Sequence, residues 1–377
     1  MKIDLIVGAR PNFMKAAPLY HALQNHPELF EVRLIHTGQH YDRKMSRIFF
    51  EELGLPKPDV YLGVGSGSHA EQTGAVMTEY EKLLIDDPVD LVLVVGDVNS
   101  TLACSLVAKK LHIKLGHIEA GLRSFDRRMP EEINRLVTDS VADYLFTTSR
   151  DADEHLKKEG HSENSIFFVG NLMIDSLEEF LPRADCSNLL DSLEIESGEY
   201  GLITLHRPSN VDDEEIFTGI LEAFQEIQGE LPLIFPAHPR TKQRIHELTA
   251  SGALESMPGL HIIDPVGYLE FIGLERDAKI ILTDSGGIQE ESTVLGVPCL
   301  TLRENTERPV TVEVGTNRLV HPAKDEILDA VRAALDAAES SGEIPEYWDG
   351  HAAGRIVDIL IEVNALIDES NASTLNS

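Results

Sequence analysis

The sequence contains few cysteines and no long apolar run, and both absences limit what the protein is. Its cysteines are Cys104, Cys186 and Cys299, which lie far apart and form no Cys-x-x-Cys pair. That spacing offers no zinc-binding pattern and is typical of a reduced compartment. No stretch is apolar for long enough to span a bilayer, and the N-terminus lacks the basic flank and apolar core of a signal peptide. We therefore expect a soluble, cytoplasmic protein with no membrane partner and no metal site.

Positive charge is also scarce. The chain has 32 Lys plus Arg against 64 Asp plus Glu, which gives a formal net charge of -32. Such a field repels nucleic acid and acidic membranes, so we expect no nucleic-acid partner. Any phosphate ligand must then be held by a local positive site, built from backbone amides or a few arginines, against the sign of the whole molecule.

Short apolar runs alternate with amphipathic segments of helical length along most of the chain. This alternation is typical of parallel sheets covered by helices on both faces. A chain of 377 residues exceeds one ordinary core, so two successive doubly wound α/β domains are favoured over one very wide sheet. The predicted strands lie in the runs KIDLIVG, EVRLIHTG, DLVLVVGD, IKLGHIEAG, DYLFTTS, SIFFVG, YGLITLHR, LPLIFPAH, LHIIDPV, KIILTDSGG and PCLTL.

The predicted boundary between the two domains lies near the stretch GNLMIDSLEEFLPRAD. We assign residues 1–170 to an N-terminal Rossmann-like domain and residues 171–354 to a C-terminal one. The last helical pattern, in 355–370, fits against either domain by its periodicity alone.

Polar residues follow most of the predicted strands. Ligands of doubly wound sheets bind outside the carboxyl ends of the strands, so these residues are the informative ones. Because they come from both halves of the chain, they suggest a cleft between two domains. The residues are Arg10, His36 to His40, Asp97, His117 to Glu119, His206, Arg207, His238, Asp284 and Ser285.

The stretch LTDSGGIQEESTVLGVP, residues 282–298, ends a strand at an acid, a hydroxyl and two glycines. Ser285, Gly286 and Gly287 leave backbone amides uncovered at the expected start of a helix, where a phosphate binds well. A serine cap and a tight turn that need no ligand are the alternative. Glu290 and Glu291 favour a nucleotide, since a carboxylate one turn later can accept bonds from ribose hydroxyls. The glycines do not form G-x-G-x-x-G, so we predict no nicotinamide or other cofactor.

Several motifs together resemble the non-hydrolysing UDP-N-acetylglucosamine 2-epimerases. They are GARPNFMK at 8–15, HIEAGLRS at 117–124, MPEEINR at 129–135, TDSGGIQEE at 283–291 and TERP at 306–309. The resemblance implies the GT-B fold, in which two Rossmann-like domains face a central cleft and the C-terminal helix returns to the first domain. It also implies a homodimer, a role in cell-surface polysaccharide biosynthesis, and interconversion of UDP-N-acetylglucosamine and UDP-N-acetylmannosamine.

This reaction needs several proton-transfer groups, because the C2 proton of the sugar is not acidic until the bond from C1 to oxygen begins to break. Elimination of UDP to a 2-acetamidoglucal meets that need, with a base on one face of the ring and an acid on the other. By resemblance the candidates are Asp97, Glu119 and Glu131. His206 is the fourth, because histidine needs little perturbation to shuttle protons, and a local hydrogen bond at a strand end is its alternative. Structural alternatives stay open: a turn or cap role for Asp97, pairing of Glu119 with Arg123, and a first-turn helix acid for Glu131.

The UDP contacts implied by the resemblance involve two arginines and an aromatic residue. Arg10 and Arg308 are expected at the diphosphate, because guanidinium groups match phosphate oxygens in a bidentate geometry. Phe271 occupies the position of the family's uracil-stacking residue, and a core position on an amphipathic helix is its alternative.

The sequence departs from the bacterial pattern at two places. Ala9 and Asn12 stand where the bacterial motif GTRPE has threonine and glutamate. Downstream, Gln39 and His40 are kept but are followed by Tyr41 and Asp42, in a region where bacterial members bind a second substrate molecule as activator. We therefore expect allosteric activation to be weakened here.

Three other functions are compatible with these residues. Close relatives of the family act on UDP-2,3-diacetamido uronic acids, a GT-B glycosyltransferase would use the same nucleotide cleft, and an inactive sensor would bind UDP without turnover. A transferase would not need three acids around the sugar.

Overall fold

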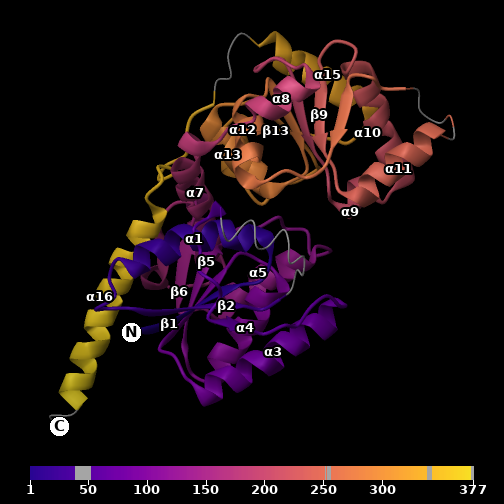
Figure 1. Ribbon diagram of the computed structural model, residues 1–377. Coiled ribbons are helices and arrows are strands. Elements are labelled where there is room, and N and C mark those ends of the chain that lie inside the picture. Colours follow the sequence, from indigo (N-terminus) through magenta and orange to yellow (C-terminus); the bar gives the residue numbers. More distant parts are fainter. Residues whose placement is uncertain (39–51, 251, 253–255, 338–341, 375–377) are drawn as a thin grey trace. The chain divides into compact units, whose positions relative to one another are not determined.

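Both halves of the chain fold into doubly wound parallel sheets, as the computed structural model shows (Figure 1). The structure describes residues 1–38, 52–250, 252, 256–337 and 342–374. The chain divides into two compact units, residues 1–179 with 346–377 and residues 180–345. The predicted domain limits, 1–170 and 171–354, stay a prediction.

The first unit contains a seven-stranded sheet in the order β3-β2-β1-β4-β5-β6-β7, and every pair of neighbours is parallel. Strand β4 reads LVLVV and is buried throughout, because helices cover both faces of a parallel sheet. The strands are β1 (Lys2–Val7), β2 (Glu31–His36), β3 (Val60–Tyr61), β4 (Leu91–Val95), β5 (Lys114–Ala120), β6 (Tyr144–Thr147) and β7 (Ile166–Phe168).

The helices of the first unit begin at recognisable signals. Ser68 and Glu71 form a capping box at the start of α3, and Pro130 opens α5. The last helix, α16, belongs to this unit, and its first amides, those of Ala352 and Ala353, donate to Asp175 at 3.0 and 2.7 Å. The helices are α1 (Arg10–Gln24), α3 (His69–Asp86), α4 (Asn99–Lys110), α5 (Pro130–Val141), α6 (Arg150–Lys158), η1 (Glu163–Ser165), α7 (Leu172–Phe180) and α16 (Ala352–Thr374).

The second unit repeats the plan with six parallel strands in the order β10-β9-β8-β11-β12-β13. Its strands are β8 (Gly201–Thr204), β9 (Leu233–Pro236), β10 (Leu260–Ile263), β11 (Ile280–Thr283), β12 (Cys299–Leu302) and β13 (Asn317–Val320). Its helices are η2 (Leu181–Arg183), α8 (Ser187–Leu193), α9 (Pro208–Val211), α10 (Glu214–Ile227), α11 (Pro239–Ala250), α12 (Tyr268–Arg276), α13 (Gly286–Leu295), α14 (Pro309–Glu313) and α15 (Lys324–Asp336).

Each sheet has one topological switch point, where the chain changes the direction in which it adds strands. In the first unit the switch lies between β1 and β4, and in the second between β8 and β11. The carboxyl ends of these strands are where doubly wound sheets bind ligands. The predicted fold class and every predicted strand are confirmed, whereas β3 and β13 were not predicted. Strand β3 has two residues, and β13 begins with Asn317 and Arg318, so neither shows an apolar run.

No helix among the described residues is both long enough and apolar enough to cross a membrane.

Candidate active site

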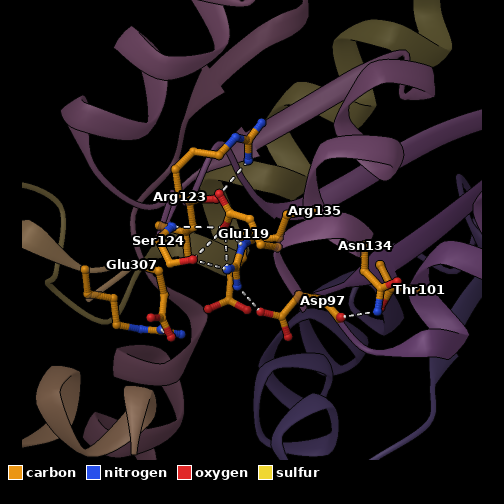
Figure 2. Close-up of polar contacts among 12 residues, drawn as sticks. Asp97, Thr101, Glu119, Arg123, Ser124, Asn134, Arg135 and Glu307 are labelled. Carbon is orange, nitrogen blue, oxygen red and sulfur yellow. Dashed lines mark hydrogen bonds and ion pairs between the residues drawn. The ribbon is translucent and has the colours of Figure 1, made fainter. Parts of the chain in front are cut away.

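Asp97 lies at the switch point of the first sheet, directly after Gly96, which follows the last residue of β4. Its carboxylate forms an ion pair with Nη1 of Arg135, and its carbonyl oxygen accepts a hydrogen bond from Asn134 at 2.8 Å (Figure 2). Both partners lie on α5. Helix α4 begins after Val98, so Asp97 is not its cap. The structure therefore attaches Asp97 to a neighbouring helix and leaves its side chain 30% exposed.

Glu119 lies near the end of β5, next to β4 in the sheet. Its backbone has φ +70, an uncommon conformation for a residue with a side chain, and the pairing register shifts between Ile118 and Ala120. Its buried carboxylate forms an ion pair with Nζ of Lys15 from α1. Arg123, the alternative partner, instead contacts Asp139 at 2.7 Å and Glu159 at 2.6 Å.

The turns that carry Asp97 and Glu119 are adjacent. A Cβ atom added at Gly96, the residue before Asp97, would lie 3.2 Å from Oε2 of Glu119. Lys15 was not predicted. Its one sequence signal is its place in GARPNFMK, a little over one helical turn after Arg10.

Helix α5 carries two consecutive glutamates with different surroundings. Glu131 is exposed in the first turn, as the helix-start reading expected. Glu132 is buried, and its carboxylate accepts bonds from the amides of Ser124 and Phe125 at 3.0 Å and from Nη2 of Arg135 at 2.6 Å. Burial raises the pKa of Glu132, but these bonds outweigh it and hold the pKa below its ordinary value. Glu132 was not predicted, although its i,i+3 spacing to Arg135 signals a pair.

Arg10 is the first residue of α1, directly after the turn that leaves β1; the described part of the structure gives its backbone place and not its side chain. Asn12 explains one departure from the bacterial motif. Its Oδ1 accepts from the amide of Ala9 at 3.0 Å, and its Nδ2 donates to the carbonyl oxygen of Val95 at 2.9 Å. An ionised glutamate only accepts, so it could not make the second bond, which joins the first turn of α1 to the end of β4.

His206 and Asp284 form a pair at the switch point of the second sheet. Nδ1 of His206 lies 2.8 Å from Oδ1 of Asp284, and the imidazole is 64% exposed. Asp284 is fully buried and also accepts from the backbone amides of His206 and Arg207 at 3.1 and 2.9 Å. Burial raises the pKa of Asp284, but His206 and these amides outweigh it and lower the pKa. The carboxylate therefore orients the ring and leaves Nε2 on the exposed side for proton transfer.

Ser285, Gly286 and Gly287 form the start of α13, next to Asp284. Ser285 occupies the N-cap position, but its side chain makes no capping hydrogen bond, unlike the serine at the start of α3. A Cβ atom added at Gly286 would lie 2.9 Å from Cζ of Arg308, so glycine is required for the guanidinium to pack there. The structure thus places an arginine against the amides predicted to bind phosphate.

Arg308 is one of three arginines around the buried carboxylate of Glu307. Nη1 of Arg308 and Nη2 of Arg303 both lie 2.7 Å from Glu307, and Nη2 of Arg207 lies 3.6 Å away. Burial raises the pKa of Glu307, but the arginines outweigh burial and lower it well below its ordinary value. Arg308 also donates to Glu290 at 2.6 Å. Glu307 lies in the TERP motif, whereas nothing in the sequence singled out Arg303.

The two residues expected at the uridine have defined places. Glu291, on α13, is buried and accepts a hydrogen bond from the hydroxyl of Tyr268 at 3.0 Å. Phe271, on α12, is half-buried and packs against the core cluster that includes Leu274 and Ile281. Part of the Phe271 ring is therefore in the core, as the alternative expected. The exposed part leaves room for a base to stack on it.

The prediction about activation concerns Gln39, His40, Tyr41 and Asp42, which lie outside the described residues. Among residues 1–38, 52–250, 252, 256–337 and 342–374, no group of three or more His, Cys, Asp or Glu side chains is arranged to hold a metal ion.

Two parallel α/β units with polar residues at their switch points define a protein of the GT-B class. The chain is similar to the crystal structure of Methanocaldococcus jannaschii UDP-GlcNAc 2-epimerase in complex with UDP-GlcNAc and UDP. The TM-score is 0.87 and the identity 46%, over 96% of this chain and 100% of that chain.

The chain belongs to the UDP-N-acetylglucosamine 2-epimerase family, whose model matches residues 21–361. It is 46% identical over 366 residues to the UDP-N-acetylglucosamine 2-epimerase of Methanocaldococcus jannaschii, covering 96% of this chain and 99% of that one. It is 44% identical over 367 residues to the UDP-2,3-diacetamido-2,3-dideoxy-D-glucuronate 2-epimerase of Pseudomonas aeruginosa, covering 96% and 100%. The resemblance seen in the motifs is confirmed, and the protein belongs to a family of isomerases.

Proposed function

We propose that this protein interconverts UDP-N-acetylglucosamine and UDP-N-acetylmannosamine without a cofactor. The observation that carries the proposal is the pair of adjacent turns in the first unit, one of which carries Asp97 and the other Glu119. In the forward direction UDP leaves C1 with the electron pair of the C1–O bond, and a carboxylate takes the C2 proton. The 2-acetamidoglucal then accepts UDP again at C1 and a proton at C2 on the opposite face.

The residues of the first unit, apart from Arg10, are assigned to the sugar, and those of the second unit to UDP. We assign proton transfer at the sugar to Asp97, Glu119 and Glu131, and proton transfer at the diphosphate to His206, whose ring Asp284 orients. The amides of Ser285, Gly286 and Gly287 with Arg308 and Arg10 bind the diphosphate, Glu291 binds the ribose, and Phe271 stacks on the uracil.

Incubation with UDP-N-acetylglucosamine in heavy water tests the proposal. Deuterium at C2 together with UDP-N-acetylmannosamine identifies an epimerase. Transfer that depends on an acceptor would identify a glycosyltransferase, release of free mannosamine product would identify a hydrolysing enzyme, and binding of UDP with no reaction would identify a sensor.

Four variants test the assigned roles. Asp97→Asn, Glu119→Gln, Glu131→Gln and His206→Asn should each lower turnover by roughly two to four decades, the range for one positioned acid or base. UDP affinity, measured by calorimetry, should change much less. Glu81→Gln, an exposed carboxylate on α3, is the matched control and should leave turnover unchanged. Normal turnover in any of the four variants removes that residue from the mechanism.

A related substrate, a UDP-2,3-diacetamido uronic acid, is the second candidate, because the Pseudomonas relative is nearly as similar as the archaeal one. The two sugars should be compared in the same deuterium assay, and the higher kcat/KM identifies the substrate. We further propose a cytoplasmic homodimer that supplies a precursor for cell-surface polysaccharide. Light scattering on the purified protein tests the dimer.

A further inference from the structure

His117 lies in the middle of β5 and is fully buried, two residues before Glu119. Its Nε2 lies 2.9 Å from the carbonyl oxygen of Gly96, the residue before Asp97. Because a carbonyl oxygen only accepts, Nε2 carries a proton and donates it to this contact. The imidazole therefore reaches across from β5 and holds the backbone of the turn after β4.

The other ring nitrogen of His117 contacts a buried acid on α5. Nδ1 lies 2.6 Å from Oδ1 of Asp139, which is fully buried. The second oxygen of Asp139 accepts from the amide of Gly121 at 3.1 Å, and Nη2 of Arg123 lies 2.7 Å from it. Gly121 is two residues after Glu119. One carboxylate thus joins the imidazole to the turn after β5.

We propose that His117 and Asp139 are positioning residues that lock together the two turns that present Asp97 and Glu119. The inference rests on the proposed function, which gives those two carboxylates their roles. Lys15 and Arg135 touch the carboxylates directly, whereas the contacts of His117 and Asp139 go to the backbone of Gly96 and Gly121. The spacing of the two carboxylates is thereby set by a chain of hydrogen bonds from Gly96 through the imidazole and Asp139 to Gly121.

A buried ionic network is a poor means of stabilising a core, because well-packed apolar residues often do as well. Its geometry, in contrast, is directional, and small displacements of reacting groups cost large factors in rate. The network also lies on both sides of Glu119, through His117 and Gly121. The backbone of Glu119 has φ +70, a conformation that persists only where its surroundings impose it.

Two substitutions at His117 divide the network in different places. In His117→Asn the amide takes the place of Nδ1, so the contact with Asp139 is kept and the contact with Gly96 is lost. In His117→Gln the amide reaches the place of Nε2, so the carbonyl oxygen of Gly96 keeps its donor. Asp139 then loses its contact with the side chain at position 117. Each variant should lower kcat roughly ten- to a hundredfold, the cost of misplacing reacting groups by about 1 Å. The Kd for UDP should stay unchanged, because its proposed ligands other than Arg10 lie in the other unit.

Asp139→Asn should lower kcat to a similar extent, because it weakens the bonds of the carboxylate to His117 and to the amide of Gly121 and removes the ion pair with Arg123. The double variant His117→Gln, Asp139→Asn should be little slower than the slower single variant, since residues that act as one unit are not additive. Multiplied effects would mean two independent roles and would overturn the proposal.

Tyr80→Phe is the matched control. Its hydroxyl donates to the buried carboxylate of Asp4 at 2.8 Å in the same unit, at the opposite end of the sheet from the two turns. The control should lower the melting temperature, as expected for one lost buried hydrogen bond, but should leave kcat unchanged. If the His117 and Asp139 variants lose melting temperature without losing kcat, the residues are only structural and the proposal is wrong.

Amide hydrogen exchange provides a readout that does not depend on catalysis. In His117→Asn the peptide covering 96–99 should exchange faster than in the native protein, and in His117→Gln the peptide covering 119–123 should, whereas in Tyr80→Phe neither should. If the native protein epimerises no UDP-sugar, the proposed function fails, and exchange alone then decides the inference. Unchanged exchange in both peptides overturns it in either case.

Discussion

Glu307 gathers three guanidinium groups in a chain that has twice as many acidic as basic side chains. An isolated arginine in such a protein would be neutralised by whichever acid lies nearest. Buried Glu307 instead fixes the positions of Arg207, Arg303 and Arg308, and their three positive charges outnumber the negative charges of Glu307 and of Glu290, which pairs with Arg308. This is the kind of site that the net charge requires for any phosphate ligand.

Glu307→Gln should destabilise the protein at neutral pH by about 3–5 kcal/mol, because it leaves buried arginines without their partner. The folded pKa of Glu307 lies below its ordinary value of 4.5, so the native carboxylate stabilises the fold above that value. Its contribution is lost as the pH falls through the folded pKa. Thermal unfolding of both proteins between pH 7 and pH 3 should therefore show a difference that narrows below about pH 4.5.

Glu346→Gln is the control for this experiment. Glu346 pairs with Arg150 at 2.7 Å, but both side chains are more than half exposed. Exposed pairs contribute little, so this variant should melt like the native protein. A gap between Glu307→Gln and the native protein that widens toward acid would contradict the assigned sign.

Gly286→Ala should weaken UDP binding about tenfold or more, because the added methyl group displaces Arg308 from Glu290 and Glu307 and so removes a charge-assisted bond to the diphosphate. A larger side chain, as in Gly286→Val, should weaken it further. Calorimetric titration of UDP measures the effect. Gly74→Ala, in the exposed middle of α3 where a methyl group meets nothing, is the control and should leave Kd unchanged. Native affinity in both Gly286 variants would mean that the glycines serve only the turn.

At the scale of elements, aromatic and cationic side chains attach the returning segment 346–355 to the first unit. Phe168, on β7, stacks on Tyr347 with ring centroids 4.8 Å apart. Arg150 lies over Phe168 at 4.1 Å, and Arg355 lies over Tyr347 at 4.0 Å. The two stacked rings thus lie between two cations, and each cation lies within the distance at which such contacts are favourable. They hold the start of α16 where Asp175 caps it.

Tyr347→Ala should loosen this attachment, with a loss of roughly 0.5–1.5 kcal/mol from ring stacking and of roughly 0.5–1 kcal/mol from the cation. Amide exchange in the first turns of α16 and tryptic cleavage after Arg355 should both become faster. Ile344→Ala, an exposed position three residues earlier, is the control and should change neither rate. Unchanged exchange in Tyr347→Ala would assign the attachment of α16 to Asp175 and the apolar contacts alone.

At the scale of the whole molecule, the net charge of -32 opposes folding through self-repulsion. Salt shortens the range of this repulsion from roughly 30 Å at about 0.01 M to roughly 3 Å at about 1 M. Buried pairs such as Lys15–Glu119 are screened much less than exposed charges. Salt should therefore weaken the repulsion between exposed like charges more than the attraction within buried ion pairs.

The melting temperature should accordingly rise with sodium chloride over this range. Chloride is preferred to sulfate, because sulfate stabilises proteins by exclusion whatever their charge. Sucrose at equal osmolality separates screening from exclusion and should raise the melting temperature less. A melting temperature that falls with sodium chloride would mean that exposed ion pairs outweigh the repulsion.

The fold class, every strand of the described residues except β3 and β13, and the turn at Ser285 to Gly287 could be predicted from the sequence. Runs such as LVLVV are buried on both sides and so carry a signal that depends on neighbouring residues alone. The motifs likewise identified the family, because residues close together in the chain, such as 283–291, form one strand, one turn and one helix start.

What only the tertiary structure decided are contacts between residues far apart in the chain. Lys15 meets Glu119 across 104 positions, and His117 meets the carbonyl oxygen of Gly96 because β5 lies beside β4 in the sheet. Glu131 and Glu132 are equivalent as sequence, and only the packing of α5 against the loop at Ser124 buries one and exposes the other. Such contacts depend on the order of the strands in the sheet and on which face of each helix points to the core. Both are decided by the burial of apolar side chains throughout the unit and not by any short stretch of residues.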